Sequence, residues 1–336
     1  MSEIFEMRRP DDFHLHLREA RMLNVVSSYL RPFGRALVMP NTNPPILDAG
    51  NVRRYRNNIL KASHPYSFEP LMTIQIVEGT RPGTVFEAKE AGAVAGKVYP
   101  RGMTTNSENG VLNYRAIYPA LEAMQKCGMR ACFHGESPDP DVFCLDRETR
   151  FLKILKEIAH VFPGLKIVLE HVTTAKAVEC VTELPGNVAA TITVHHLFLT
   201  LDDVVGGKLH PHHFCKPVAK RPEDRAALRE AAMSGNPKFF FGSDSAPHLR
   251  QDKECASGCA GVFTVPVALS LLVEFFERYG TLNRLEDFCS SFGADFYGVP
   301  RSQETIRLVR DKWVVPQTYN GIVPFRAGEE IAWRVE

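Results

Sequence analysis

The segment Asp11-Asp12-Phe13-His14-Leu15-His16-Leu17-Arg18 places two histidines two positions apart near the start of the chain. Side chains alternate between the two faces of a β-strand, so a strand here would point both imidazoles the same way. The same alternation turns three apolar residues to the opposite face: Phe13, Leu15 and Leu17. Paired imidazoles at a strand end suit a divalent metal ion, but an isolated His-x-His can equally be a pair of surface histidines. The rest of the chain decides between these interpretations.

Apolar, β-rich runs recur along the chain, and most of them are followed by an amphipathic stretch. Eight runs are predicted strands, at residues 7–16, 35–39, 70–77, 93–99, 129–133, 165–169, 188–194 and 238–242. Strands that alternate with helices favour a parallel sheet, and eight of them favour a closed (β/α)8 TIM barrel of the α/β class. An open doubly wound sheet is the alternative, but no Gly-x-Gly-x-x-Gly follows the first strand.

Helices are predicted between these strands from apolar residues at helical spacing. They cover residues 51–62, 84–91, 114–127, 147–162, 175–184 and 222–233, with closing helices at 264–279 and 284–296. Gly128 fits the position that ends the helix at 114–127. Residues 314–335 are predicted to form strands and loops, a small C-terminal extension packed beside the barrel. Residues 1–336 are therefore expected to form a single domain.

The composition fits one large barrel and excludes several classes of protein. A chain of 336 residues with 44% hydrophobic residues can bury a sizeable core. Its 40 Lys and Arg residues nearly balance 39 Asp and Glu residues, so the charge does not indicate nucleic-acid binding. No secretory leader and no apolar run of membrane-spanning length is visible in the sequence. The eight cysteines are scattered, which favours a cytoplasmic protein with reduced thiols.

The active sites of (β/α)8 barrels form at the carboxyl ends of the strands. In this chain most of the predicted strands deliver polar residues there: His14, His16, Arg18, Asn41, Lys97, His134, His171, Asp244 and His248. Twelve histidines scattered at random would rarely fall at so many strand ends. Arg18 continues the face of the first two histidines, where it could hold an anion. The agreement among strands predicts a metal site.

Lys97 interrupts an apolar strand of small residues, where an unpaired ammonium would be costly to bury. A barrel lysine paired with a carboxylate is one interpretation. A buried lysine also loses its proton readily. The neutral amine can react with carbon dioxide to give a carbamate, which is a carboxylate on a long arm that can bridge two metal ions. Both interpretations stay open from the residue alone.

His134 and His171 each directly follow an apolar strand, and their equivalent positions favour metal ligands over core or rim residues. Asp244 ends a very hydrophobic strand, where an aspartate is either a cap for the next segment or a metal-linked base. The other ligands favour the base.

Several other histidines and cysteines are not assigned to this site. His195 and His196 end the strand at residues 188–194, and one of them could line the site. Three histidines are clustered in a loop and are expected to be solvent-exposed: His210, His212 and His213. His64 and His160 are expected to lie on the surface or in helices. Cys255 and Cys259 are the one close cysteine pair, but structural zinc sites usually offer four ligands at tighter spacing.

These residues belong to motifs that run through nearly the whole chain in order. The motifs are Arg9-Pro-Asp-Asp-Phe-His-Leu-His-Leu-Arg18, Val38-Met-Pro-Asn41, Gly96-Lys-Val-Tyr-Pro100, Thr104-Thr-Asn106, His134-Gly-Glu136, Glu170-His-Val-Thr-Thr174, Ala190-Thr-Ile-Thr193, Gly242-Ser-Asp-Ser-Ala-Pro-His248, Cys259-Ala-Gly261 and Phe296-Tyr-Gly298. With them the chain resembles the amidohydrolase superfamily and, within it, the shorter, monofunctional dihydroorotases. Phe13 replaces a tryptophan that is common in the family, and Lys216 stands where several bacterial relatives have leucine.

The resemblance implies two zinc ions per subunit, bridged by N6-carboxylated Lys97 and a hydroxide. One ion would be held by His14, His16, Lys97 and Asp244, and the other by Lys97, His134 and His171. The substrate carboxylate would be bound by Arg18, Asn41 and His248, with backbone contacts near Ala260 and Lys216. Thr104 and Thr105 would belong to a flexible loop that closes over the bound substrate.

The implied activity is the reversible cyclisation of N-carbamoyl-L-aspartate to L-dihydroorotate and water in de novo pyrimidine (UMP) biosynthesis. Hydroxide between the zinc ions would attack the ring amide, and Asp244 would carry the proton to the leaving nitrogen as general acid and base. A homodimer with a small-molecule substrate, and no nucleic acid or membrane partner, is expected.

Two rival functions remain open from the sequence. Another cyclic amidase of the same superfamily, acting on hydantoins, dihydropyrimidines or allantoin, would use the same metal ions. Uncharged hydantoins do not need the carboxylate contacts of Arg18 and Asn41, which favours dihydroorotate. A non-catalytic assembly protein should have lost some of the ligands, and this sequence retains every one.

Overall fold

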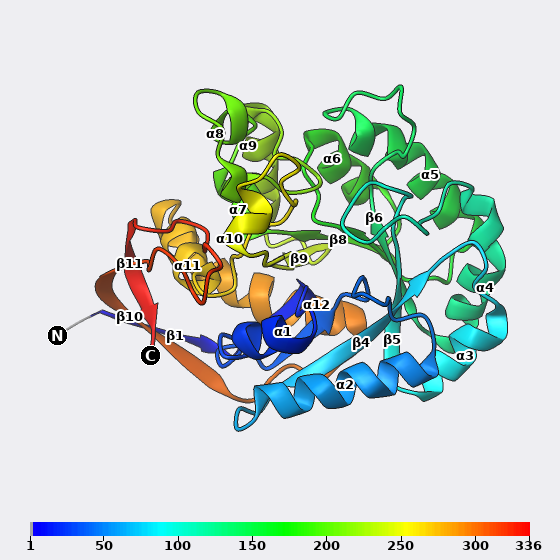
Figure 1. Cartoon of the computed structure of the whole chain (residues 1–336), viewed down its shortest axis with the longest axis horizontal. Helices are drawn as coiled ribbons and strands as arrows, with labels where there is room; N and C mark the ends of the chain where they lie inside the picture. The colour runs from blue at the N-terminus through cyan, green and yellow to red at the C-terminus, as the bar shows by residue number, and fades with distance from the viewer. Residues whose placement is uncertain (1–2) are drawn as a thin grey trace.

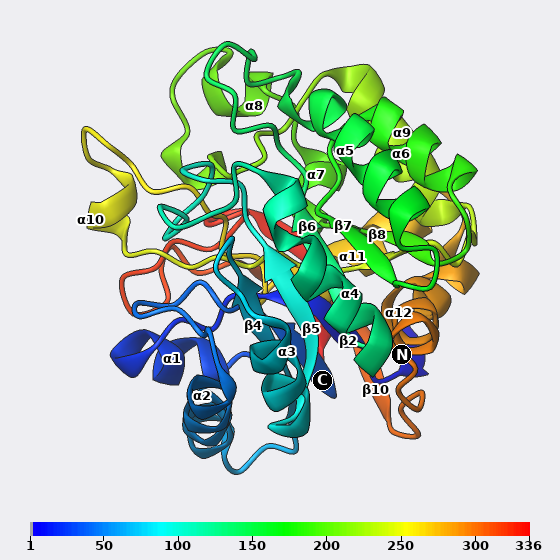
Figure 2. The same cartoon turned by 90° about the vertical axis from the view of Figure 1, so that its right-hand side faces the viewer.

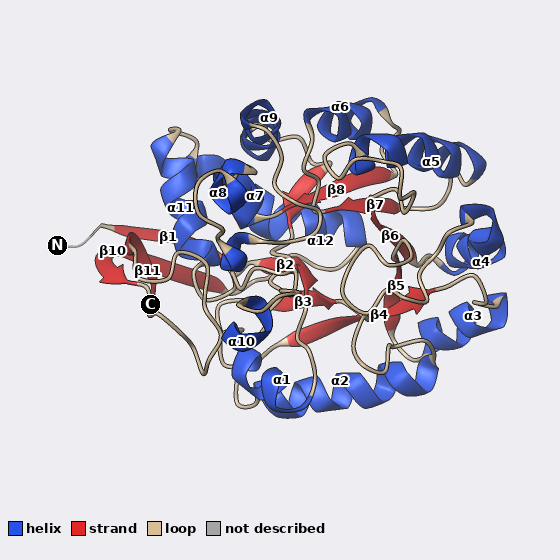
Figure 3. Ribbon diagram, turned by 45° about the horizontal axis from the view of Figure 1, so that its top comes forward, coloured by secondary structure: helices blue, strands red, loops and turns tan. Residues whose placement is uncertain are grey.

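The computed structural model describes residues 3–336 of the chain. Eight parallel strands lie side by side in sequence order. They are β2 (Asp11–Leu15), β3 (Arg35–Val38), β4 (Glu69–Ile76), β5 (Ala93–Val98), β6 (Arg130–His134), β7 (Ile167–Glu170), β8 (Val188–Ile192) and β9 (Phe239–Phe241). The carboxyl ends of β2 and β9 meet, because Asp244 N–H donates to His14 O at 2.9 Å and His16 N–H donates to Ser245 O at 3.2 Å. The predicted (β/α)8 barrel is confirmed, and Figure 3 shows its strands surrounded by helices.

Helices follow the strands and cover the outside of the barrel (Figure 2). They are α1 (Ala20–Ser27), α2 (Ala49–Ser63), α3 (Pro82–Glu90), α4 (Tyr118–Cys127), α5 (Arg147–Val161), α6 (Ala175–Glu183), α7 (Val194–Phe198), α8 (Asp202–Val205), α9 (Pro222–Met233), α10 (Arg250–Lys253), α11 (Ala268–Arg278) and α12 (Phe292–Tyr297). Asp48 accepts a hydrogen bond from Asn51 N–H at the start of α2, and Gly128 ends α4 with a φ of 71°. Such start and stop signals explain why the helices predicted between the strands agree closely with the observed bounds.

An apolar layer fills the barrel interior near the amino ends of the strands. Its members are Phe13, Leu37, Leu71, Ala95, Cys132, Val168, Ala189 and Phe240, all buried. Alternate residues of a strand face the same way, so residues two positions further along four of these strands also face the interior. These are polar and buried: Lys97, His134, Glu170 and Thr191. The polar layer therefore lies at the carboxyl end, above a packed apolar floor.

A second, antiparallel sheet lies beside the barrel and is formed by β1 (Ile4–Arg8), β10 (Thr305–Val314) and β11 (Glu330–Val335). Figure 1 shows that this sheet contains the first and the last strand of the chain, β1 and β11. Leu308 and Trp333 from this sheet are fully buried in the apolar core that also packs the barrel against its helices. The predicted C-terminal extension is present, but its first strand begins at Thr305, before the predicted range, and β1 joins it from the N-terminal side.

The predicted first strand at residues 7–16 is wrong as a single element, because β1 belongs to the small sheet and β2 to the barrel. Pro10 has no N–H to donate to a sheet, and Arg9 N–H donates to Glu304 O instead. The predicted helix at 284–296 is interrupted by a π-helical turn at Asp287–Ser291 before α12.

The start of one closing helix and the whole of α1 also differ from the prediction. The helix predicted from residue 264 begins at Ala268, because the N–H groups of Thr264 and Val265 donate to Ser245 Oγ at the end of the barrel. Helix α1 follows the first barrel strand in a region where no helix was predicted.

Candidate active site

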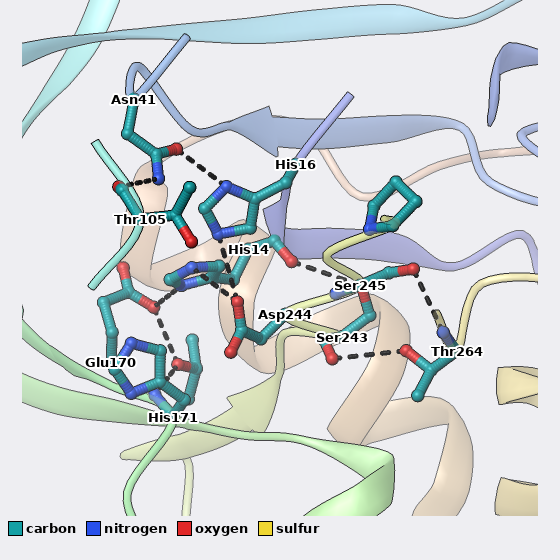
Figure 4. A network of polar contacts seen from close by, with 12 residues as sticks. His14, His16, Asn41, Thr105, Glu170, His171, Ser243, Asp244, Ser245 and Thr264 are labelled. Atoms are coloured by element: carbon teal, nitrogen blue, oxygen red, sulfur yellow. Dashed lines mark hydrogen bonds and ion pairs between the residues drawn. The ribbon is translucent and has the colours of Figure 1, made fainter. Parts of the chain in front are cut away.

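The strand end that carries His14 and His16 departs from simple alternation. Phe13 packs in the apolar layer inside the barrel, whereas Leu15 and Leu17 pack outside it against the helices. The register of β2 on β3 shifts before Leu15, which marks a β-bulge. The prediction that Phe13 shares a face with the two leucines is wrong for this reason. Bulges often re-aim side chains beside active sites, and here both imidazoles point into the barrel (Figure 4).

The buried carboxylate of Asp12 holds the bulge in place. Its Oδ1 accepts hydrogen bonds from His14 N–H at 3.1 Å and from Ser243 N–H at 2.8 Å. Asp12 therefore connects the first barrel strand to the segment that follows the last one, and it fixes the backbone on both sides of the site.

In each histidine of the first strand, Nδ1 contacts a side-chain oxygen and Nε2 faces the site. His14 Nδ1 lies 2.7 Å from Glu170 Oε2, and His16 Nδ1 lies 2.8 Å from Asn41 Oδ1. Their Nε2 atoms lie 3.4 Å and 3.1 Å from the same oxygen, Oδ1 of Asp244. Burial lowers the pKa of both histidines, and a neutral imidazole is the form that binds a metal ion.

Lys97 reaches the same interior from β5, where it pairs with Gln75 of β4 and Cys132 of β6. The side chain is fully buried, and its Nζ has no hydrogen-bond partner within residues 3–336. Burial lowers the pKa of Lys97. Among the described residues Lys97 therefore has no carboxylate in hydrogen-bond contact, although the charges of Glu170 and Asp244 raise its pKa against the effect of burial.

His134 and His171 lie beside the first-strand pair. Their ring centres are 4.7 Å apart, and the ring of His171 is 5.0 Å from that of His14. His134 Nε2 lies 2.7 Å from Glu136 Oε2. His171 has a left-handed φ of 39°, and its N–H donates to Thr191 Oγ1 at 2.7 Å. Among the described residues its Nδ1 has no partner, so this nitrogen is available to a ligand.

Asp244 lies beyond the end of β9 with a left-handed φ of 44°. The ligand atoms of His14, His16 and Asp244 all lie within 4.8 Å of one another. Burial raises the pKa of Asp244, and the neighbouring His14 and Lys97 lower it. In the described part of the chain no backbone N–H donates to its carboxylate, so Asp244 does not serve as a cap.

Three residues that were predicted to bind the substrate carboxylate lie close together: Arg18, His248 and Ala260. Arg18 Nη2 lies 2.9 Å from His248 Nε2, and Ala260 lines the same small cavity as Arg18. Burial, and then the charge of Arg18, lower the pKa of His248 to about 3, so its ring is neutral. Over residues 3–336 no carboxylate forms an ion pair with Arg18, which leaves its charge for an anion. A φ of 59° places Arg18 outside the strand alternation that was used to predict its direction.

Asn41 already uses both ends of its side-chain amide. Its Oδ1 meets His16 and its Nδ2 donates to Thr105 O at 3.0 Å (Figure 4). A small cavity beside this contact is lined by Thr104, Thr105, Lys216 and Ala260, among others. The loop with Thr104 and Thr105 therefore lies against the site, and Asn41 can bind a substrate only when Thr105 gives up its hydrogen bond.

The remaining histidines lie elsewhere. The predicted strand at 188–194 ends at Ile192, because Thr193 Oγ1 accepts from His196 N–H and begins α7. His195 and His196 are thus helical residues, and both are buried. His212 pairs with Glu254 at 2.8 Å near the surface. Three others are exposed: His64, His160 and His210.

Sequence reasoning missed three polar residues that hold the predicted ligands. Glu170 contacts His14, and Glu136 contacts His134. Thr191 accepts from His171 N–H and donates to Glu170 at 2.7 Å. Metal-bound histidines usually donate their second N–H to a carboxylate or carbonyl. The available signal was a glutamate beside a strand-end histidine, as in Glu170 next to His171.

These residues fit a metal centre on the evidence of their own geometry. Four buried histidines and one aspartate face the same interior, and three of those histidines have one nitrogen held by a side-chain oxygen: His14, His16 and His134. The amine of Lys97, which has no hydrogen-bond partner in the part of the chain that the structure describes, lies among them. Nitrogen and oxygen ligands in this combination suit Zn²⁺.

Along residues 3–336 no helix has the length and apolarity needed to cross a membrane.

Comparison with known proteins gives a consistent result, although no family model matches the chain. A dihydroorotase of Marinobacter nauticus is 46% identical over 100% of both chains. A solved dihydroorotase from Campylobacter jejuni is 39% identical with a TM-score of 0.93, over 100% of this chain and 98% of that one. The Saccharomyces cerevisiae dihydroorotase, solved with 5-fluoroorotic acid, is 36% identical with a TM-score of 0.93, over 99% and 98%.

An L-hydantoinase from Arthrobacter aurescens has a TM-score of 0.84 over 98% of this chain and 83% of its own, but only 17% identity, which shows the shared fold alone. The dihydroorotases are 36–46% identical to this chain over almost its whole length, about twice the identity of the hydantoinase or more. The chain therefore belongs to the dihydroorotase family of the amidohydrolase superfamily.

Proposed function

We propose that this chain catalyses the reversible cyclisation of N-carbamoyl-L-aspartate to L-dihydroorotate and water, a step of de novo UMP synthesis. The observation that carries the proposal is Arg18, which lines one cavity with Asp244 and His16 and forms no ion pair with a carboxylate of residues 3–336. A cation beside a hydrolytic centre suits a cyclic amide that bears a carboxylate. The yeast relative was solved with 5-fluoroorotic acid, a ring of this kind.

We propose that His14, His16, Lys97 and Asp244 hold one zinc ion and that Lys97, His134 and His171 hold a second. When bound, the two ions supply Lewis acidity and lower the pKa of water. Lys97 joins the two ligand sets because its neutral amine adds to carbon dioxide, forming an N–C bond and releasing a proton, to give the N6-carboxylate. The lowered pKa and the unpaired Nζ of Lys97 support this step.

Asp244 moves the proton. In ring opening, its carboxylate takes a proton from the attacking water and passes it to the ring nitrogen that leaves. In ring closure, the same carboxyl group takes the proton from the attacking carbamoyl nitrogen and delivers it to the departing oxygen. The Nε2 atoms of His14 and His16 lie 3.4 Å and 3.1 Å from Oδ1 of Asp244, so the three groups surround one position that an ion would occupy.

Arg18 orients the substrate through its carboxylate, with His248 and the backbone of Ala260 behind it. A guanidinium binds a carboxylate with two charge-assisted hydrogen bonds. Asn41 would also bind the substrate once its Nδ2 releases the hydrogen bond to Thr105 O. Lys216 lines the same cavity. The loop of Thr104 and Thr105 then excludes water from the reacting amide.

We also propose that the protein is a cytoplasmic homodimer. The support is the family resemblance and the scattered cysteines, all eight of which are free among residues 3–336.

The test is the rate of dihydroorotate ring opening by the purified protein, with and without a zinc chelator, beside a hydantoin of similar size. Chelator-sensitive turnover of dihydroorotate alone is the expected result. Turnover of the hydantoin in place of dihydroorotate would contradict the proposed substrate. Equal rates with and without the chelator would contradict the proposed dependence on zinc.

A further inference from the structure

A second cluster of potential metal ligands lies outside the set described above. His195 and His196, in the first turn of α7, and Cys215 offer ligand atoms that all lie within 4.8 Å of one another. All three side chains are buried, with relative exposures of 0%, 1% and 1%. None of them has a role in the proposed reaction.

Three donor atoms at this place, from His196, Cys215 and the carbonyl group of Pro217, have nearly the spacing of a tetrahedral metal site. Cys215 Sγ lies 3.5 Å from His196 Nε2, and Pro217 O lies 3.1 Å from that nitrogen and 3.3 Å from the sulfur. Zinc–nitrogen, zinc–oxygen and zinc–sulfur bonds at tetrahedral angles separate their donors by roughly 3.3–3.6 Å. Three mutually adjacent donors are therefore present at nearly the required distances.

His196 is held in a way that suits ligation through Nε2. Its Nδ1 lies 2.8 Å from Thr193 Oγ1, which also accepts from His196 N–H. An outer nitrogen bonded to an oxygen is the usual arrangement of a metal-bound histidine, because it fixes both the tautomer and the direction of the ring.

His195 is the unexplained member. Within residues 3–336 neither of its ring nitrogens has a hydrogen-bond partner, although the side chain is fully buried. A buried polar atom without a partner has lost its hydrogen bonds to water and gained none in return, which destabilises the folded protein. Water could satisfy the ring only if the site were roomy enough to hold it, whereas the adjacent sulfur and imidazole would satisfy it through a shared ion.

We propose that His195, His196 and Cys215 bind a zinc ion, with the carbonyl oxygen of Pro217 as the fourth donor. One sulfur and two nitrogens are ligands that zinc commonly takes. Binding forms the sulfur–zinc bond and releases the thiol proton to solvent, and four protein donors leave no open position. The site is therefore structural and takes no part in turnover.

The consequence for the protein is a link between two segments beside the substrate cavity. The ion would join the start of α7, which follows barrel strand β8, to the segment of Cys215 and Pro217. Lys216 lies between these two residues and lines the cavity. The ion would thus hold the backbone of Lys216 in a fixed position relative to the barrel.

The experiment uses the metal-free full chain titrated with Co²⁺. A thiolate bound to Co²⁺ gives a charge-transfer band in the near ultraviolet, and the ligands proposed for the catalytic centre include no cysteine. We expect the band in the wild-type protein and no band in C215S. In H195Q we expect the Co²⁺ affinity measured from the band to fall by more than the roughly 10–100-fold that loss of an outer partner causes.

Two controls separate this site from other thiols. C180S removes a buried cysteine of α6 and should keep the band. The double variant C255S/C259S removes the exposed and half-exposed pair and should also keep it. The proposal is overturned if the wild type shows no sulfur band at saturating Co²⁺, or if the band survives in C215S. If C215S does not fold, an H195Q protein with unchanged affinity overturns it.

Discussion

Glu170 Oε2 lies 2.7 Å from Nδ1 of His14 and also accepts a hydrogen bond from Thr191, so one buried carboxylate fixes the ring of a proposed ligand. Glu170→Gln should lower zinc affinity by about 10–100-fold, because a neutral amide oxygen accepts the His14 hydrogen bond more weakly than a carboxylate and no longer raises the basicity of the ring. Competition with a chromophoric chelator measures the affinity. Glu179→Gln, on an exposed position of α6, is the matched control. Unchanged affinity in Glu170→Gln would remove Glu170 from the metal centre.

Lys97→Met should have opposite effects on stability and on activity. In the metal-free protein it replaces a buried amine without a hydrogen-bond partner, so the free energy of unfolding should rise by about 1–3 kcal/mol. The same variant lacks the nitrogen that joins the two proposed ligand sets, so zinc binding and turnover should be lost. Urea unfolding of the apo protein and metal analysis measure the two effects. A less stable apo variant would mean that the amine is well solvated in the native state.

Asp244→Asn should separate metal binding from proton transfer. The amide keeps an oxygen for the metal ion but cannot carry a proton, and general acid and base groups contribute about 10²–10⁴-fold to rates. We expect kcat to fall by that factor while the zinc content stays close to that of the wild type. Asp202→Asn, on an exposed position of α8, should leave both unchanged. Near-normal turnover in Asp244→Asn contradicts its role as the base.

Arg18→Met should act on the substrate carboxylate and not on the chemistry. Hydrogen bonds to charged groups contribute about 1.5–3 kcal/mol, so kcat/KM for dihydroorotate should fall roughly 10–100-fold. Any slow turnover of an uncharged hydantoin should be unaffected, and Arg21→Met, on an exposed position, serves as control. Equal losses for both substrates would show that Arg18 supports the fold and not the carboxylate.

Lys253 gives a pH dependence of stability. Its ammonium donates to the carbonyl oxygens of Phe214, Cys259 and Gly261, and burial lowers its pKa to about 8. Between about pH 8 and the unfolded value near 10.5, the unfolded chain binds a proton that the native chain has lost. Stability should therefore rise with pH in this window, by up to about 1.4 kcal/mol per pH unit. Urea unfolding of the wild type and of Lys253→Met should show this slope in the difference between them. Parallel curves would refute the shift.

The barrel could be predicted because each of its signals is local and repeated. Most of the strands are short apolar runs, and residues such as Lys97 and His134 follow from alternation within one strand. The full set of predicted ligands then comes together because parallel strands end at the same side of the sheet. The functional role of each ligand remains a proposal.

Other features depend on contacts between distant parts of the chain and could not be predicted. The bulge beneath His14 requires Asp12 to meet Ser243, which lies 231 residues later. The occupation of both ends of Asn41 depends on Thr105, 64 residues away. The end of β8 is set by a cap at Thr193, which accepts from His196 N–H, so the strand predicted to reach residue 194 ends at Ile192. No single window of sequence contains both partners of the first two contacts.

Closure of the barrel between His14 and the segment of Asp244 also sets the order of events during synthesis. Ser243 Oγ donates to His14 O across a separation of 229 residues. At about 5–20 residues per second, a ribosome needs roughly 10–45 s to cover that distance. For that time the first two histidines exist in the cell without Asp244. An ion captured early would have to be held by an incomplete set of donors, so the proposed centre can offer all of its donors only after the last barrel strand has left the ribosome.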